Sequence, residues 1–186
     1  MKKVCVAVNI LLVLLSFACA NTADDKKSQQ YIEVNPRENI EKVNKFLSEK
    51  DKDRIESFLR RQDLTADFDE SGFWIARIEP GNGTKIQEGS AVALAATISL
   101  LDGTLCYTYT EYNPLIFVVN KSNELSETSE LQNAVSGLHS ALSLLEDQER
   151  AVLIFPPHLA HGVIGDNNNI PPRSILVYDI KVLEVK

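Results

Sequence analysis

The segment from residue 151 to residue 185 constrains the fold of this chain more than any other part of the sequence. An apolar run, 151–155, ends at a pair of prolines and is followed by a long polar excursion. A second pair, Pro171-Pro172, then leads into another apolar run, 175–185. Apolar runs bounded by proline and glycine are typical of strands. The pattern predicts two strands joined by a loop over 156–174, called the return loop below.

Hydrophobic periodicity elsewhere predicts an α+β fold. In the prefix 36–71, apolar residues recur at three- and four-residue steps, and a second helical segment ends in the basic pair Arg60-Arg61. Residues 72–186 carry strand patterns separated by turn signals, including the hairpin dipeptide Asp102-Gly103, and a single clear helix over 129–145. One helix laid on an antiparallel sheet is an α+β design. We therefore expect one domain over 72–186, preceded by an N-terminal helical segment.

The chain begins like an export signal. Lys2 and Lys3 precede an apolar run over 4–17, which is shorter than the roughly 20 residues that a membrane span needs. Residues 1–18 are therefore predicted to be a signal peptide, and the polar residues 19–35 a tether.

Two processing routes fit this signal. Residues 15–19 resemble a bacterial lipobox, with Ser16 at the position usually held by leucine, and this route would lipidate Cys19. The sequence Ala-Cys-Ala at 18–20 also fits ordinary signal peptidase. We favour the lipoprotein, because a tether after the cysteine is what an anchored domain needs. The prediction is an exported protein, lipid-anchored in the bacterial cell envelope.

Charge and cysteine content narrow the possible partners. The net charge of −7 argues against nucleic acid as a partner. Of the three cysteines, only Cys106 lies in the folded part, where no disulfide is expected and a small buried hydrophobe is favoured over a reactive thiol. His158 and His161 form an H-x-x-H pair, but no third ligand converges on it, so no metal site is expected.

Five short motifs occur together in the order found in one protein family. They are Pro80-Gly81-Asn82-Gly83, Asp102-Gly103, Val135-Ser136-Gly137-Leu138, Ala160-His161-Gly162 and Ile170-Pro171-Pro172. From Phe73 to Lys186 the chain resembles the FKBP-type peptidyl-prolyl cis–trans isomerases. With its lipobox and helical prefix it also resembles the FKBP-like lipoproteins of Bacteroidetes, including those associated with gliding motility. The resemblance implies an antiparallel sheet wrapped on one central helix, proline-containing protein segments as substrates, and no cofactor.

The resemblance also implies which residues form the site. Rotation about an X-Pro bond must overcome a barrier of about 18–20 kcal/mol, and an apolar cup with donors for the substrate carbonyl is enough to lower it. The catalytic positions implied by the family are Val135, His161 and Tyr178. The walls of the substrate pocket would be formed by Ala96, Cys106, Tyr107, Leu115, Leu138 and Ile170. These nine residues are called the cup below.

Several cup residues differ from the family pattern. Ala96, Cys106, Leu115 and Leu138 stand where the family has aromatic residues, Tyr107 replaces an aspartate, and His161 replaces a tyrosine. Aromatic faces contribute much of the apolar contact in such pockets. The sequence therefore predicts a weak isomerase or chaperone that acts on proteins at the envelope. The alternative is a non-catalytic binding or structural subunit of an envelope machine.

Overall fold

The computed structural model describes residues 36–119 and 135–186. Residues 40–186 belong to one compact unit. The predicted signal peptide and tether, Cys19, and residues 129–134 of the predicted central helix lie outside the described residues. Neither helix of the described part is long and apolar enough to cross a membrane.

Helix α2, Pro36–Arg61, is one continuous helix of 26 residues. The sequence had indicated two helical segments, and this expectation is wrong. Residues 37–61 contain neither glycine nor proline, so nothing interrupts the backbone hydrogen bonds between the two apolar stretches. Arg60 and Arg61 in the last turn suit the negative end of the helix dipole.

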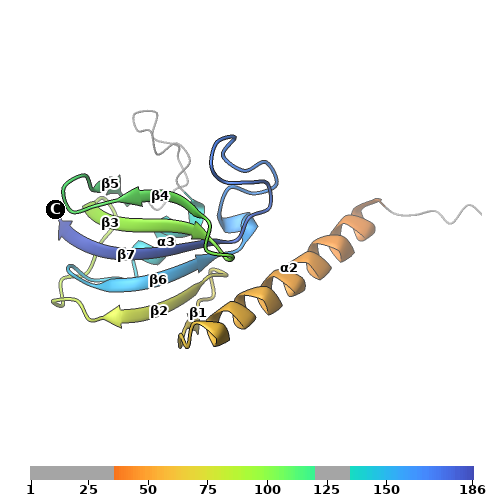
Figure 1. Ribbon diagram of the computed structural model, residues 1–186, viewed down its shortest axis with the longest axis horizontal. Helices are drawn as coiled ribbons and strands as arrows, with labels where there is room; N and C mark the ends of the chain where they lie inside the picture. Colours follow the sequence, from red (N-terminus) through yellow and green to blue (C-terminus); the bar gives the residue numbers. More distant parts are fainter. Residues whose placement is uncertain (1–35, 120–134) are drawn as a thin grey trace, which may run out of the picture. The chain divides into compact units, whose positions relative to one another are not determined.

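Within the described residues, seven strands form one antiparallel sheet (Figure 1). The strands are β1 Asp67–Phe68, β2 Trp74–Glu79, β3 Ala91–Leu100, β4 Leu105–Tyr109, β5 Leu115–Val118, β6 Arg150–Phe155 and β7 Leu176–Val185. Their order is β1-β2-β6-β7-β3-β4, and β5 also pairs with β3. The first half of β3 pairs with β5 and the second half with β4. The predicted hairpin at Asp102-Gly103 joins β3 to β4.

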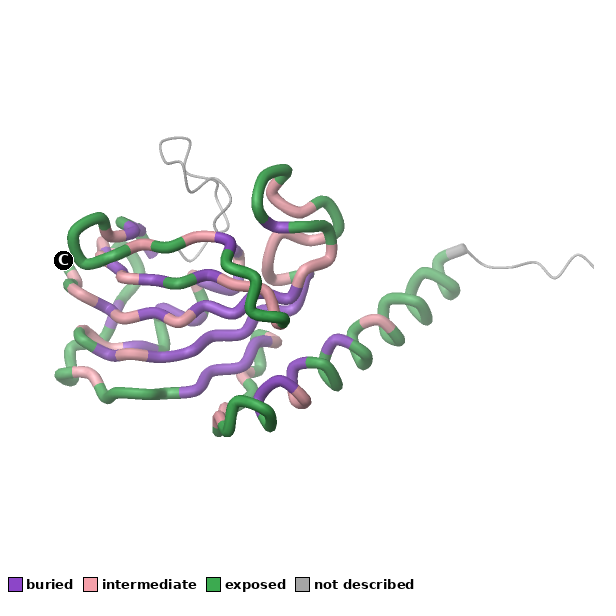
Figure 2. Tube along the Cα trace, in the orientation of Figure 1, coloured by how far each residue is buried: buried purple, intermediate pink, exposed green. Residues whose placement is uncertain are grey.

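Strand β6 is buried on both faces of the sheet, and the middle of the sheet is correspondingly buried in Figure 2. Ala151, Leu153 and Phe155 belong to one hydrophobic cluster. Val152 and Ile154, which alternate with them, belong to a second cluster. Because successive strand residues point to opposite faces, this one strand contributes to two separate cores.

Helix α3, Ser136–Leu142, covers the first of these faces. It ends at Leu142, earlier than the predicted helix over 129–145, and Leu145 is buried in the turn that follows, where its amide donates to the Leu142 carbonyl at 3.0 Å. A Cβ atom at Gly137 would lie 2.5 Å from Cδ1 of Phe155. The absence of a side chain at Gly137 therefore allows α3 to approach β6 closely.

The second face is covered by the C-terminal half of α2. Ile55, Phe58 and Leu59 are buried there among side chains of β2, β6 and β7. The apolar residues of the N-terminal half are mostly exposed, for example Phe46 at 63%. The helix prefix is thus held on the sheet by its last turns, through the same kind of burial that holds α3.

Candidate functional site

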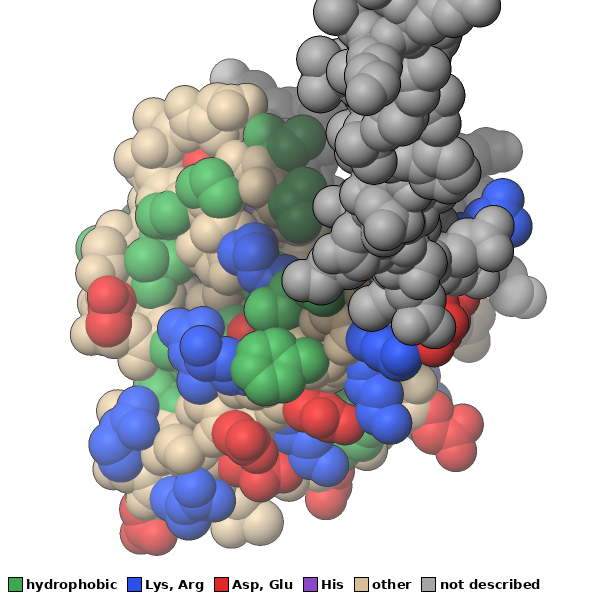
Figure 3. Space-filling model, turned by 90° about the vertical axis from the view of Figure 1, so that its right-hand side faces the viewer, with side chains coloured by type: hydrophobic (Ala, Val, Ile, Leu, Met, Phe, Trp, Pro, Cys, Tyr) green, Lys and Arg blue, Asp and Glu red, His purple; other side chains and the backbone are tan. Residues whose placement is uncertain are grey.

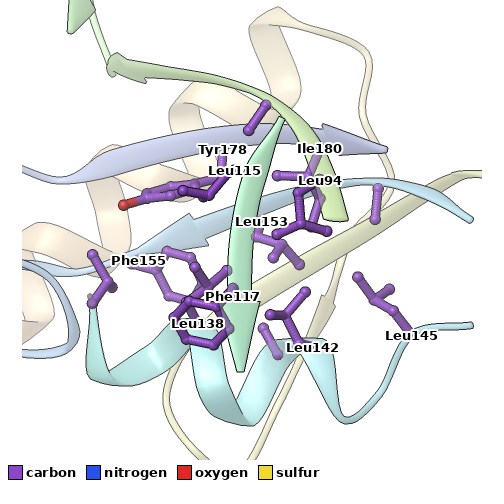
Figure 4. Packing of buried hydrophobic residues seen from close by; sticks show 14 of the residues in the cluster. Leu94, Leu115, Phe117, Leu138, Leu142, Leu145, Leu153, Phe155, Tyr178 and Ile180 are labelled. Atoms are coloured by element: carbon purple, nitrogen blue, oxygen red, sulfur yellow. The ribbon is translucent and has the colours of Figure 1, made fainter. Parts of the chain in front are cut away.

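The fold brings the cup residues together around one end of the first hydrophobic core. Seven of them are buried members of that cluster, and Tyr107 packs against it. The seven are Ala96, Cys106, Leu115, Val135, Leu138, Ile170 and Tyr178. In Figure 4, Leu138 and Leu142 of α3 lie below the strands that carry Leu153, Tyr178 and Ile180.

Tyr178 connects the core to the cup. Its ring meets that of Phe155 edge-on, with centroids 5.3 Å apart. Its hydroxyl points away from Leu153 and Ile180 in Figure 4. Burial, together with nearby ionisable groups, raises the pKa of Tyr178. The hydroxyl therefore stays protonated and remains a hydrogen-bond donor at neutral pH.

The cup offers little open surface in this state. Val135 and Leu138 are each 1% exposed, and Ile170 is 3% exposed. Their small or aliphatic neighbours Ala96, Cys106 and Leu115 are also buried, so apart from Tyr107 and Tyr178 the apolar walls are aliphatic.

The return loop is closed by backbone hydrogen bonds at its base and within it. The loop begins with the short helix η1, Pro157–Leu159. At its base, Gly162 donates to the Pro157 carbonyl at 2.8 Å and accepts from the Arg173 amide at 2.9 Å. Further out, the Asp166 amide donates to the Ile170 carbonyl at 3.1 Å. These bonds give the loop a defined shape despite its length.

Asp166 organises the outer part of this loop. Its Oδ1 accepts hydrogen bonds from the backbone amides of Asn168, at 2.9 Å, and Ile170, at 2.8 Å. Its Oδ2 accepts one from the Tyr107 hydroxyl of β4. Burial would raise the pKa of Asp166, but these hydrogen bonds, with a contribution from His161, outweigh it and lower the pKa. The carboxylate is therefore charged at neutral pH and links the loop to the sheet.

His161 is half-buried beside this carboxylate. Burial lowers the pKa of His161, and the charge of Asp166 opposes the shift without cancelling it. The imidazole is therefore neutral at pH 7, with one ring nitrogen available as a donor and the other as an acceptor. The nitrogen that carries the proton can supply the hydrogen bond expected of a tyrosine at this position.

Cys106 behaves as part of the core. It is a buried free cysteine, and burial raises the pKa of its thiol. A neutral, buried thiol is a poor nucleophile. Its carbonyl accepts a hydrogen bond from the Asn169 side chain at 3.1 Å, which gives the return loop a second link to β4.

Sequence reasoning missed the part that Asp166 and the asparagines after it play in the site. The run 167–169 reads as a flexible turn, yet Asn168 and Asn169 both direct side-chain amides to β4. An aspartate at the start of a polar loop, able to accept amides two and four residues later, is the signal that was available. The partner Tyr107 lies 59 positions away and has no local signal.

An antiparallel sheet over one helix, with an apolar cup bordered by a polar return loop, is the arrangement expected of a prolyl isomerase. Comparison with known proteins agrees. Residues 82–183 match the family model for FKBP-type peptidyl-prolyl cis–trans isomerase. The chain therefore belongs to the FKBP-type peptidyl-prolyl cis–trans isomerases.

The chain is similar in sequence to isomerases from an insect and from a bacterium. Peptidyl-prolyl cis–trans isomerase Fkbp12 of Drosophila melanogaster is 30% identical over 117 residues, which are 62% of this chain and 99% of that protein. FkpA of Escherichia coli K12 is 29% identical over 110 residues, which are 59% of this chain and 36% of FkpA.

Two solved structures share the fold. An isomerase from Pseudomonas syringae gives a TM-score of 0.57 at 21% identity and covers 76% of this chain and 95% of its own. The crystal structure of FkpA from Escherichia coli gives 0.56 at 21% identity, over 97% of this chain and 81% of FkpA.

Proposed function

We propose that this isomerase acts weakly on X-Pro bonds of proteins at the bacterial cell envelope, to which a lipid on Cys19 anchors it. The observation that carries the catalytic part is the gathering of Val135, Leu138, Ile170 and Tyr178 in one apolar cluster bordered by the return loop. The envelope location rests on the N-terminal signal and lipobox.

The cup lowers the barrier by two effects. A planar amide is more polar than a twisted one, so an apolar surround favours the twisted state of the X-Pro bond. Donors then stabilise the substrate carbonyl as it rotates. We assign this donation to the Val135 backbone N–H and the neutral His161 ring, with the Tyr178 hydroxyl at the wall. No nucleophile, metal or cofactor takes part.

The low rate follows from the composition of the walls. Ala96, Cys106, Leu115 and Leu138 present less apolar area to a proline ring than aromatic side chains do. The burial of Leu138 and Ile170 also leaves little of either side chain exposed to a substrate.

A non-catalytic binding subunit of an envelope machine is the second candidate. The observation that favours it is the burial of seven of the nine cup residues, because a filled pocket would leave the outer surface as the functional part.

A peptide isomerisation assay separates the two functions. The protein should accelerate cis-to-trans conversion of a proline tetrapeptide, and Tyr178→Ala and His161→Ala should each reduce the acceleration. Rates equal to the uncatalysed rate at high enzyme concentration would leave only the binding subunit. Surface substitutions that abolish function while both cup variants retain it would also favour the binding subunit.

The anchor needs a separate test, which is mass spectrometry of the mature N-terminus. A diacylated or triacylated Cys19 is expected. An unmodified N-terminus at Asn21 would exclude the lipoprotein and support cleavage by ordinary signal peptidase.

A further inference from the structure

Helix α2 contacts the return loop through an ion pair whose carboxylate, Asp51, is buried and whose guanidinium, Arg173, is 37% exposed. Oδ2 of Asp51 accepts a hydrogen bond from Nη2 of Arg173 at 2.9 Å, and Oδ1 lies 3.7 Å from Nη1 of Arg54. Asp51 is 7% exposed, one of the few buried charged residues in the described part of the chain. A carboxylate removed from water is costly unless a partner compensates it. The pairing with Arg173 therefore constrains where the loop can lie.

Arg173 occupies a strained position at the base of the return loop. Its φ is +57°, a left-handed conformation that a residue with a side chain adopts only when its surroundings hold it there. Its amide donates to the carbonyl of Gly162 at 2.9 Å. It therefore joins the segment just after His161 to the Pro171-Pro172 turn that follows Ile170. A shift of Arg173 would move two cup residues together.

Helix α2 is a suitable fixed support for this contact. Asp51 lies one turn before Ile55, on the helix face whose later residues, Phe58 and Leu59, are buried on the sheet. Between helix and loop lies a groove of about 470 Å³, lined by Ser48, Pro157 and Val163 among others. Asp51 and Arg173 also line this groove. Apolar packing between helix and loop is therefore incomplete, and the ion pair provides a direct contact between them. Figure 3 shows the corresponding side of the molecule, where hydrophobic side chains lie among basic and acidic ones.

We propose that Asp51 is a positioning residue of the isomerase site, which acts through Arg173 to hold His161 and Ile170 in register with the rest of the cup. The inference rests on the proposed function of the cup. It makes the helical prefix a part of the catalytic unit.

The test compares Asp51→Asn and Arg173→Gln with the unaltered protein. Each variant should lower kcat/KM for a proline tetrapeptide by about three- to tenfold, since small misplacement of a positioned group slows a reaction to at least this extent. The loss should appear in kcat as well as in kcat/KM, which is the kinetic signature of a group positioned for the transition state. The double variant should lose no more than either single one, because the two residues act as a unit.

A second readout measures the loop directly. Hydrogen exchange at the Arg173 amide should become faster in Asp51→Asn, because this amide closes the base of the loop. The matched control is Arg77→Gln, which breaks another ion pair to a buried carboxylate, Glu149. Glu149 precedes β6 whereas the return loop follows it, so the control should lower Tm and leave both kcat/KM and loop exchange unchanged.

The possible outcomes are distinguishable. Unchanged kcat/KM and unchanged loop exchange in Asp51→Asn would overturn the inference, as would an equal loss of kcat/KM in Arg77→Gln. If the unaltered protein shows no isomerase activity, the proposed function fails, and loop exchange alone decides whether Asp51 holds the loop.

Discussion

Replacement of Asp166 by alanine should loosen the return loop without unfolding the domain. The side chain accepts three hydrogen bonds, from the amides of Asn168 and Ile170 and from the hydroxyl of Tyr107. A hydrogen bond contributes about 1 kcal/mol net, and more when one partner is charged. Because the site is partly exposed, we expect a loss of about 2–3 kcal/mol in the free energy that keeps the loop closed.

That loss corresponds to an increase of about 30- to 150-fold in the population of open loop, at 1.4 kcal/mol for each factor of ten. Native-state hydrogen exchange at the Ile170 and Arg173 amides measures this population. Exchange at β6 and β7 amides, which reports opening of the sheet, should change little. The isomerase rate should fall as well, since His161 and Ile170 flank the altered residue.

Asp102→Ala is the matched control, because Asp102 also caps a polar turn by accepting a backbone amide, that of Thr104 at 2.9 Å. It lies in the β3–β4 hairpin and should leave the return loop unaffected. The reasoning would be refuted if Asp166→Ala left exchange at Ile170 and Arg173 unchanged. It would also be refuted if exchange rose equally in β6 and β7, because the effect would then be global.

Three further variants test the site and its support. The kcat/KM of the unaltered protein should be constant at neutral pH and above, where His161 is uncharged. It should fall in acid as the ring, whose pKa burial lowers, becomes charged and makes the apolar cup more polar. His161→Gln should abolish this inflection in a pH–rate profile. Gly137→Ala should destabilise the fold by about 1–3 kcal/mol in urea denaturation, because the overlap with Phe155 exceeds the gain in helix propensity; an unchanged midpoint would contradict the close packing. Tyr178→Leu should lower both stability and kcat/KM, and a loss confined to stability would remove Tyr178 from the site.

Much of the fold could be predicted because its signals are local. The hairpin at Asp102-Gly103, the strand 151–155 and the double-proline return are all encoded within a few neighbouring residues. Two elements without a clear local pattern were predicted incorrectly: strand β1 was not predicted, and helix α2 was predicted as two segments. Strand β1 has only two residues, too few to show alternation, and the continuity of α2 depends on polar residues whose helix propensity overrides the gap between two apolar stretches.

The candidate site divides in the same way. Four cup residues, Val135, Leu138, His161 and Ile170, lie in short motifs, and the other five follow from the resemblance of the strands between them. The fold places eight of the nine in or against one hydrophobic cluster. The polar links of the return loop could not be predicted, since Asp51 and Arg173 are 122 positions apart and neither differs locally from an ordinary surface residue. Whether a charged side chain is buried or solvated depends on the assembled fold.

Strand β6 contributes side chains to both hydrophobic cores, so neither core can be complete until β6 and β7 have been synthesised. The apolar side chains of α2 leave the ribosome early, yet their partners on β6 and β7 lie roughly ninety to one hundred and twenty residues later. The longest pairing of β3 is with β7, which is synthesised last of the strands in the described residues. Long-range pairing of this kind is slow to form and exposes apolar surface in the interim. A nascent chain that lacks its last strand therefore has two incomplete cores, and premature termination before residue 176 should yield a substrate for proteases and not a truncated isomerase.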